Sequence, residues 1–171
     1  GRRPVEPEGR RPVEPEGRRP VEPEGRKPVE PEGRKPIEPK SQKIRILIVD
    51  DSPTIGNLLK KIFKQDADLE VIAYASSPAM VENLIQIHQP HVMTLDIHMP
   101  EEDGLQFLGK HRDKLPPVVM LSSVSRENSE LAFKALSLGA SDYVEKPTLA
   151  NLIDKGDELR AKLRCAYRAS L

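Results

Sequence analysis

Several residue types are scarce or absent in the sequence, and this scarcity excludes some classes of protein. Its 171 residues include one cysteine, Cys165, no tryptophan, three phenylalanines and three tyrosines. A single cysteine cannot form an internal disulfide, so we expect a reducing, cytoplasmic location and not a disulfide-stabilised secreted domain. No apolar run approaches the roughly 20 residues that a membrane-spanning helix needs. A membrane protein is therefore not expected.

The chain also lacks net charge. It carries 27 basic and 27 acidic residues, which gives a formal net charge of zero. Bulk electrostatic attraction to nucleic acid or to a membrane surface needs an excess of positive charge. We therefore expect neither as a partner, and function must lie in local sites.

Proline is abundant, and it is distributed unevenly. Residues 1–40 hold ten of the 17 prolines and consist of five copies of an octapeptide that begins as GRRPVEPE. Each proline fixes φ, removes a backbone donor and disfavours helix at the preceding residue. One Val or Ile per repeat cannot bury enough surface to offset the entropy lost on ordering the chain. Residues 1–40 are predicted to form a disordered arm with polyproline II character.

Two interpretations of this arm remain open. It is a spacer, or its Pro-x-x-Pro spacing, as from Pro4 to Pro7, is a multivalent ligand for an aromatic groove. The chain starts at Gly1 without an initiator methionine or an apolar signal segment. We therefore expect a fragment or a processed product.

The remaining residues alternate between strand and helix signals. The apolar run at 44–49 is typical of a strand buried on both faces. Ser52 and Pro53 follow as an N-cap and a first helical residue, and apolar positions then recur at helical spacing. Five such units predict an α/β fold with a doubly wound, five-stranded parallel sheet. The other predicted strands are 69–74, 92–95, 117–121 and 143–144, and the other predicted helices begin at Ser77, span 105–110 and 127–138, and run from Thr148 to about Arg168.

The helices carry further expectations. Pro90 ends the second helix, and Gly139 provides a left-handed cap after the fourth. In the last helix, Gly156 costs about 1 kcal/mol of helix propensity, so we expect the part beyond it to be looser. Two inner faces are predicted: Val81, Leu84, Ile85 and His88 in the second helix, and Leu149, Leu152, Ile153, Leu159 and Leu163 in the last.

Three predicted strands run directly into charged residues, in IRILIVDD, VMTLDIHMP and DYVEKP. In a parallel sheet these strand ends would bring Asp50, Asp51, Asp96 and Lys146 to one edge, where ligands bind. Carboxylates about 5 Å apart repel by roughly 3 kcal/mol at an effective dielectric of 20, so cationic charge is needed. Oxygen-only ligands suit Mg²⁺. Asp96 is the expected nucleophile for a phosphoryl group, with Lys146 and Ser122 contacting its oxygens.

These ordered motifs resemble the receiver domain of bacterial response regulators, a flavodoxin-like fold, over residues 42–150. The resemblance implies that Asp96 accepts phosphate from a sensor histidine kinase. It makes Asp51 and Asp96 direct ligands of Mg²⁺, joined by the backbone carbonyl of His98, and Asp50 a ligand through water. It also assigns Ser122 and Tyr143 as switch residues and Lys146 as a catalytic lysine preceding a proline that is often in a cis peptide.

The segments MTLDIHMPEEDGLQFL, PVVMLSS and ALSLGASDYVEKP are similar to the receiver half of chemotaxis protein-glutamate methylesterases. In that family the receiver covers a C-terminal esterase domain and phosphorylation releases the block. The sequence stops at Leu171 in what resembles the interdomain helix, with no G-x-S-x-G motif after the receiver. We expect this chain alone not to hydrolyse methyl esters.

The histidines do not follow a metal-ligand pattern. His98 lies two residues after Asp96, where methylesterases commonly carry an acidic residue. Its side chain is either solvated or overhangs the pocket and tunes dephosphorylation. We expect the remaining histidines, His88, His91 and His111, to be structural or solvated.

The expected organisation is an arm at 1–40, a receiver core at 41–150, and the end of the final helix with the start of a linker at 151–171. The favoured function is the regulatory part of a chemotaxis methylesterase. An alternative is a stand-alone receiver that binds a partner through a face around Phe133 and Tyr143. A third interpretation, an inactive receiver in a structural repeat protein, is opposed by the complete acidic pocket.

Deletion of residues 1–40 is expected to leave the melting temperature almost unchanged, because the repeats offer no apolar face to bury. Thermal denaturation of the full and truncated chains measures this. A shift of more than a few degrees, corresponding to about 1 kcal/mol for a domain of this size, would mean that the arm packs on the domain.

Overall fold

The computed structural model describes residues 1–5, 9–13, 17, 20, 42–123 and 128–171. Contacts divide the chain into two units, Gly1–Glu38 and Pro39–Leu171. The described residues of the first unit are exposed and contain no helix or strand. The prediction of a disordered arm otherwise falls on residues outside the described ranges.

The second unit is built on a five-stranded sheet, as predicted. All strands are parallel and their order is β2-β1-β3-β4-β5. The three inner strands are almost completely buried, which explains their continuous apolar runs. The strands are β1 (Ile44–Val49), β2 (Leu69–Ala75), β3 (Val92–Asp96), β4 (Val118–Ser122) and β5 (Asp142–Glu145).

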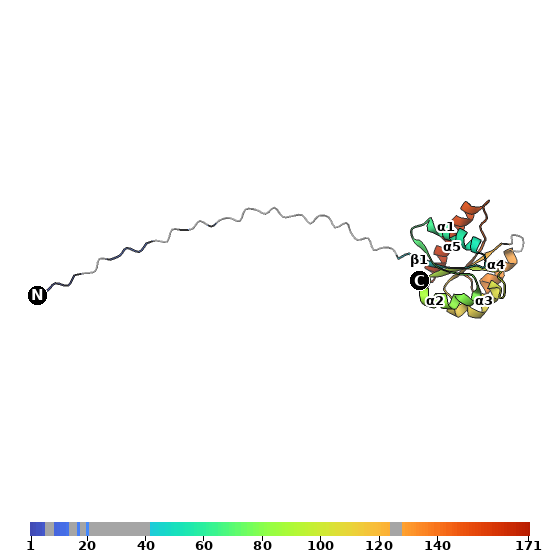
Figure 1. Ribbon diagram of the computed structural model, residues 1–171, viewed down its shortest axis with the longest axis horizontal. Coiled ribbons are helices and arrows are strands. Elements are labelled where there is room, and N and C mark those ends of the chain that lie inside the picture. The colour runs from blue at the N-terminus through green and yellow to red at the C-terminus, as the bar shows by residue number, and fades with distance from the viewer. Residues whose placement is uncertain (6–8, 14–16, 18–19, 21–41, 124–127) are drawn as a thin grey trace. The chain divides into compact units, whose positions relative to one another are not determined.

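Helices cover both faces of this sheet. Helices α1 and α5 pack on one face, and α2, α3 and α4 contribute to the core on the other; Figure 1 shows α1 and α5 on the opposite side of the sheet from α2 and α3. None of the helices among the described residues is long and apolar enough to cross a membrane. The helices are α1 (Pro53–Lys64), α2 (Val81–His88), α3 (Gly104–His111), α4 (Asn128–Ser137) and α5 (Leu152–Ala169).

Several predicted start and stop signals are confirmed. The Ser52 side chain accepts a hydrogen bond from the Ile55 amide, and Pro53 is the first residue of α1. Gly139 follows α4 with φ at 98°, the left-handed conformation that glycine adopts without strain. The helix expected at Ser77 begins with a 3₁₀ turn, Pro78–Met80, before α2. Glu127, where the fourth helix was predicted to begin, lies outside the described residues.

Two predictions about helix ends are wrong. His88 is exposed and does not lie on the inner face of α2. Thr148 does not cap α5, which begins four residues later. The Thr148 amide instead donates to the Asn151 side chain at 2.7 Å, and this local turn postpones the helix.

The predicted inner face of α5 is also partly wrong. Leu149 and Ile153 are exposed, by 88% and 79%. Beyond Gly156 the helix contributes three buried apolar side chains to the core, which opposes the expected loosening. The buried residues there are Leu159, Leu163 and Ala166.

Arginine contacts explain why the second half of α5 is held. The Arg160 guanidinium is buried and donates to the Ile62 carbonyl at 3.2 Å, near the end of α1. Arg164 donates two hydrogen bonds of 2.8 Å to the Asp68 carboxylate and pairs with Asp66. These guanidinium contacts, together with the apolar face, fix this half of the helix on α1 and on the turn between α1 and β2.

Substitution of Leu163 by alanine is expected to lower the free energy of unfolding by about 2–4 kcal/mol, because a fully buried side chain leaves a cavity. The matched variant Ile153→Ala is expected to change it by less than about 0.5 kcal/mol, since that side chain is exposed. Urea denaturation of both variants measures the difference. Equal losses would contradict the burial pattern of α5.

Candidate functional site

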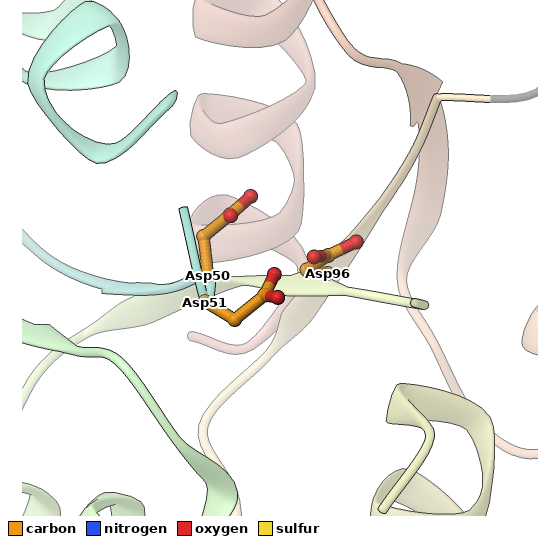
Figure 2. A group of neighbouring side chains, drawn as sticks. All are labelled: Asp50, Asp51 and Asp96. Atoms are coloured by element: carbon orange, nitrogen blue, oxygen red, sulfur yellow. The ribbon is translucent and has the colours of Figure 1, made fainter. Parts of the chain in front are cut away.

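The ends of β1 and β3 bring three carboxylates together. Val49 pairs with Leu95 in the parallel register, so Asp50 and Asp96 come next on neighbouring strands. Asp51 follows in the chain, and one oxygen from each of the three lies within 4.8 Å of the others. Figure 2 shows the three side chains side by side at these strand ends. Asp50 and Asp96 are fully buried, whereas Asp51 is exposed.

Main-chain groups orient the two buried carboxylates. Oδ1 of Asp50 accepts a hydrogen bond of 2.8 Å from the Ser52 amide, and Oδ1 of Asp96 accepts one of 3.1 Å from the His98 amide. Each carboxylate is thus held by the amide two residues further on, as in an Asx turn. Among the described residues, neither Oδ2 atom has a hydrogen-bond partner of good geometry.

Lys146 faces both of these Oδ2 atoms. Its ammonium nitrogen lies 2.9 Å from Asp50 and 3.0 Å from Asp96. The residue follows β5, and its amide donates to the Ser122 carbonyl at 2.7 Å, which fixes it beside the end of β4. One ammonium beside three carboxylates leaves two negative charges uncompensated when all groups are ionised.

The pKa values reflect this charge imbalance. Burial and the neighbouring Asp50 carboxylate raise the pKa of Asp96 to about 7. Burial by itself would lower the pKa of Lys146, but the Asp50 and Asp96 carboxylates outweigh it and raise that pKa above its usual value. The lysine therefore stays charged, and the site favours added positive charge.

The donor set fits a hard divalent cation. All candidate ligands are oxygens, and the two buried Oδ2 atoms of Asp50 and Asp96 share a single ammonium, that of Lys146. Mg²⁺ prefers carboxylate and carbonyl oxygens and retains water ligands, which the exposed side of Asp51 can admit.

Three other residues were also expected at the site. Ser122 is buried at the end of β4, and Tyr143 lies half-buried in β5. The side chain of His98 is exposed. All peptide bonds of the described residues are trans, including the one between Lys146 and Pro147, unlike the cis form that the resemblance implied is frequent.

The other histidines have separate structural surroundings. His91 accepts a hydrogen bond from the Arg45 amide and stacks on Tyr167. His111 lies 3.1 Å from Glu82 and packs against a phenylalanine. Their assignment as structural or solvated residues agrees with these contacts.

Sequence reasoning missed Gly104. A Cβ at this position would lie 2.1 Å from the carbonyl oxygen of Asp96, and the Gly104 amide donates to the Ile97 carbonyl at 2.7 Å. The loop after Asp96 therefore folds back on that residue. Nothing in the local sequence separates this glycine from an ordinary first residue of a helix.

Sequence reasoning also missed Tyr74. Its hydroxyl donates to the main-chain carbonyl of Asp50 at 2.6 Å. Burial and the carboxylates of Asp50 and Asp51 raise the pKa of this phenol, so it keeps its proton. The only available signal was a tyrosine at the end of a strand, whose hydroxyl needs a polar partner.

The comparisons with known proteins agree with this geometry. A family model described as the response regulator receiver domain matches residues 46–156. The chain belongs to this receiver family. The predicted fold class and the similarity to chemotaxis methylesterases are both confirmed.

The receiver domain is similar to curated proteins and to solved structures. It is 42% identical over 134 residues to the protein-glutamate methylesterase/protein-glutamine glutaminase 2 of Bordetella avium, covering 76% of this chain and 38% of that protein. The response regulator domain of Thermotoga maritima CheB gives a TM-score of 0.67 at 30% identity, covering 74% of this chain and 98% of that one. A CheX–CheY–BeF₃–Mg²⁺ complex of Borrelia burgdorferi gives a TM-score of 0.57 at 27% identity, covering 70% of this chain and 90% of that one.

Substitution of Gly104 by alanine is expected to lower the free energy of unfolding by at least about 2 kcal/mol, because the added methyl collides with backbone at Asp96. The control is Gly109→Ala in the same helix, where the nearest atom is a Leu138 methyl at 3.5 Å. That variant is expected to be neutral or stabilised by up to about 1 kcal/mol. Chemical denaturation measures both, and similar results for the two would contradict the close approach at Asp96.

Proposed function

We propose that the receiver domain accepts a phosphoryl group on Asp96 from the phosphohistidine of a sensor histidine kinase. The observation that carries the proposal is the position of Asp96, buried beside two more carboxylates and 3.0 Å from the Lys146 ammonium. Burial and repulsion raise the energy of this carboxylate. A pocket arranged for structure alone would not concentrate like charges in this way.

The proposed cofactor is Mg²⁺. Asp51, Asp96 and the backbone carbonyl of His98 would hold it directly, and Asp50 would act through water. When bound, it supplies the positive charge that the carboxylates lack and neutralises charge on the transferring group. The similar Borrelia complex contains both Mg²⁺ and BeF₃, which supports the assignment.

The steps of phosphoryl transfer are assigned to three residues of the chain. A carboxylate oxygen of Asp96 attacks phosphorus, the new oxygen–phosphorus bond forms, and the phosphorus–nitrogen bond of the phosphohistidine breaks. The leaving imidazole keeps the electron pair and takes up a proton. Lys146 then pairs with one phosphoryl oxygen, and the Ser122 hydroxyl donates to another.

Ser122 and Tyr143 are the proposed switch residues. Movement of Ser122 toward a phosphoryl oxygen would vacate space that the half-buried Tyr143 can fill, so phosphate would select between two packings. The adjoining α4 carries Phe133, which is 75% exposed and presents an apolar surface for a partner. This exposure favours a phosphorylation-switched binding face.

We further propose that the domain is the regulatory part of a chemotaxis methylesterase. The 42% identity to the Bordetella avium protein and the likeness to the Thermotoga receiver support this assignment. Because the chain spans 38% of that relative, the esterase activity would belong to the remainder of a longer protein. The alternative is a stand-alone binding module, which the exposed Phe133 also suits. An open reading frame that continues past residue 171 into an esterase distinguishes the two.

Incubation with acetyl phosphate and Mg²⁺ is expected to add one phosphoryl group, detected by intact mass, and chelation of Mg²⁺ is expected to abolish the labelling. Asp96→Asn is expected to lose the labelling, because a carboxamide replaces the nucleophilic carboxylate. The matched control Asp113→Asn changes an exposed aspartate outside the pocket and is expected to label normally. Undiminished labelling of Asp96→Asn would refute the assignment.

A further inference from the structure

Strand β2 contains an irregularity that redirects its last residues. Ile46 pairs with Val71, but the next residue, Leu47, pairs with Ala73, so Ile72 is an extra residue in β2. An added residue turns every following side chain to the opposite face of a sheet. The core clusters show this reversal, since Val71 and Tyr74 both belong to the α1–α5 face.

The bulge therefore places Tyr74 where it can reach the acidic pocket. In an unbroken strand Tyr74 and Val71, three residues apart, would face opposite sides of the sheet. With the bulge, the ring lies against α1 and its hydroxyl donates to the Asp50 carbonyl at 2.6 Å. Bulges commonly re-aim a side chain beside a functional site.

Helix α1 provides the space for this ring. A Cβ at Gly56 would lie 2.6 Å from a ring carbon of Tyr74, so only glycine permits the observed ring position. The Lys60 ammonium lies over the ring, 5.1 Å from its centroid. The ring is thus fixed between α1 and the end of β1.

Consecutive residues of β2 hold both polar backbone groups of Asp50. The Asp50 amide donates to the Ala75 carbonyl at 3.0 Å, and the Asp50 carbonyl accepts from the Tyr74 hydroxyl. The peptide group between Asp50 and Asp51 is therefore held in one orientation. Because the Ser52 amide already orients the Asp50 carboxylate, this peptide orientation acts mainly on the direction of the Asp51 side chain.

We propose that Tyr74 is a positioning residue for divalent-cation binding, acting through the peptide group that joins Asp50 and Asp51. The inference rests on the Mg²⁺ site proposed above. Tyr74 does not contact the cation. Its hydroxyl pre-orients the exposed Asp51 carboxylate through the main chain, so binding does not have to order the strand end.

The test measures the affinity of the full chain for Mg²⁺ alone, by following backbone amide shifts. Tyr74→Phe removes only the hydroxyl and is expected to raise the dissociation constant about fivefold, the factor that corresponds to one ordinary hydrogen bond. The ¹⁵N shift of Asp51 is expected to change in metal-free buffer, because this nitrogen belongs to the peptide group whose carbonyl loses its donor. Gly56→Ala, which displaces the ring, is also expected to raise the dissociation constant for Mg²⁺.

Tyr167→Phe is the matched control. It removes the hydroxyl of another half-buried tyrosine, whose ring stacks on His91. The control is expected to keep the wild-type affinity for Mg²⁺ and the wild-type Asp51 shift. A Tyr74→Phe protein that melts at a lower temperature but binds Mg²⁺ within twofold of wild type would overturn the inference and leave the cation site intact. Absence of Mg²⁺ binding by the wild-type chain would overturn both proposals.

Discussion

The acidic pocket depends on one unfavourable interaction, the repulsion between buried carboxylates at the ends of neighbouring parallel strands. Two such charges less than 5 Å apart repel by about 3 kcal/mol at an effective dielectric of 20. The Ser52 and His98 amides and the Lys146 ammonium offset part of this cost. The negative charge that these contacts leave uncompensated favours a cation, so the cost of burying the carboxylates and the proposed affinity for Mg²⁺ have the same origin.

The sequence carried enough information to predict the sheet and the membership of the pocket. Long apolar runs identified buried strands, and alternation with helix patterns required a parallel sheet. Parallel strands all end at one edge, so charged residues placed directly after three of them had to meet there. The convergence of Asp50, Asp96 and Lys146 was therefore predictable from the order of the strands alone. In the structure the Lys146 ammonium lies 2.9 Å from Asp50 and 3.0 Å from Asp96.

The features that escaped prediction depend on distances that no local pattern encodes. The extra residue at Ile72 interrupts strand alternation without a glycine or proline to mark it. Gly104 is required because a backbone oxygen eight residues earlier in the chain approaches it. In α5, apolar spacing fitted Ile153 as well as Leu163, and tertiary contacts such as those of Arg160 and Arg164 determine which side is buried.

The two halves of α5 are consequently unequal. Arg160 and Arg164 attach the second half to α1 and to the turn between α1 and β2, away from the pocket. The first half begins six residues after Lys146, and its side chain at Ile153 is exposed. The first half is held by different contacts, since Leu152 packs against the core and Lys155 pairs with Glu145 of β5 and with Glu158. Buried leucines and guanidinium contacts thus fix the second half of the helix, whereas a single partly buried leucine and a lysine with two acidic partners hold the first.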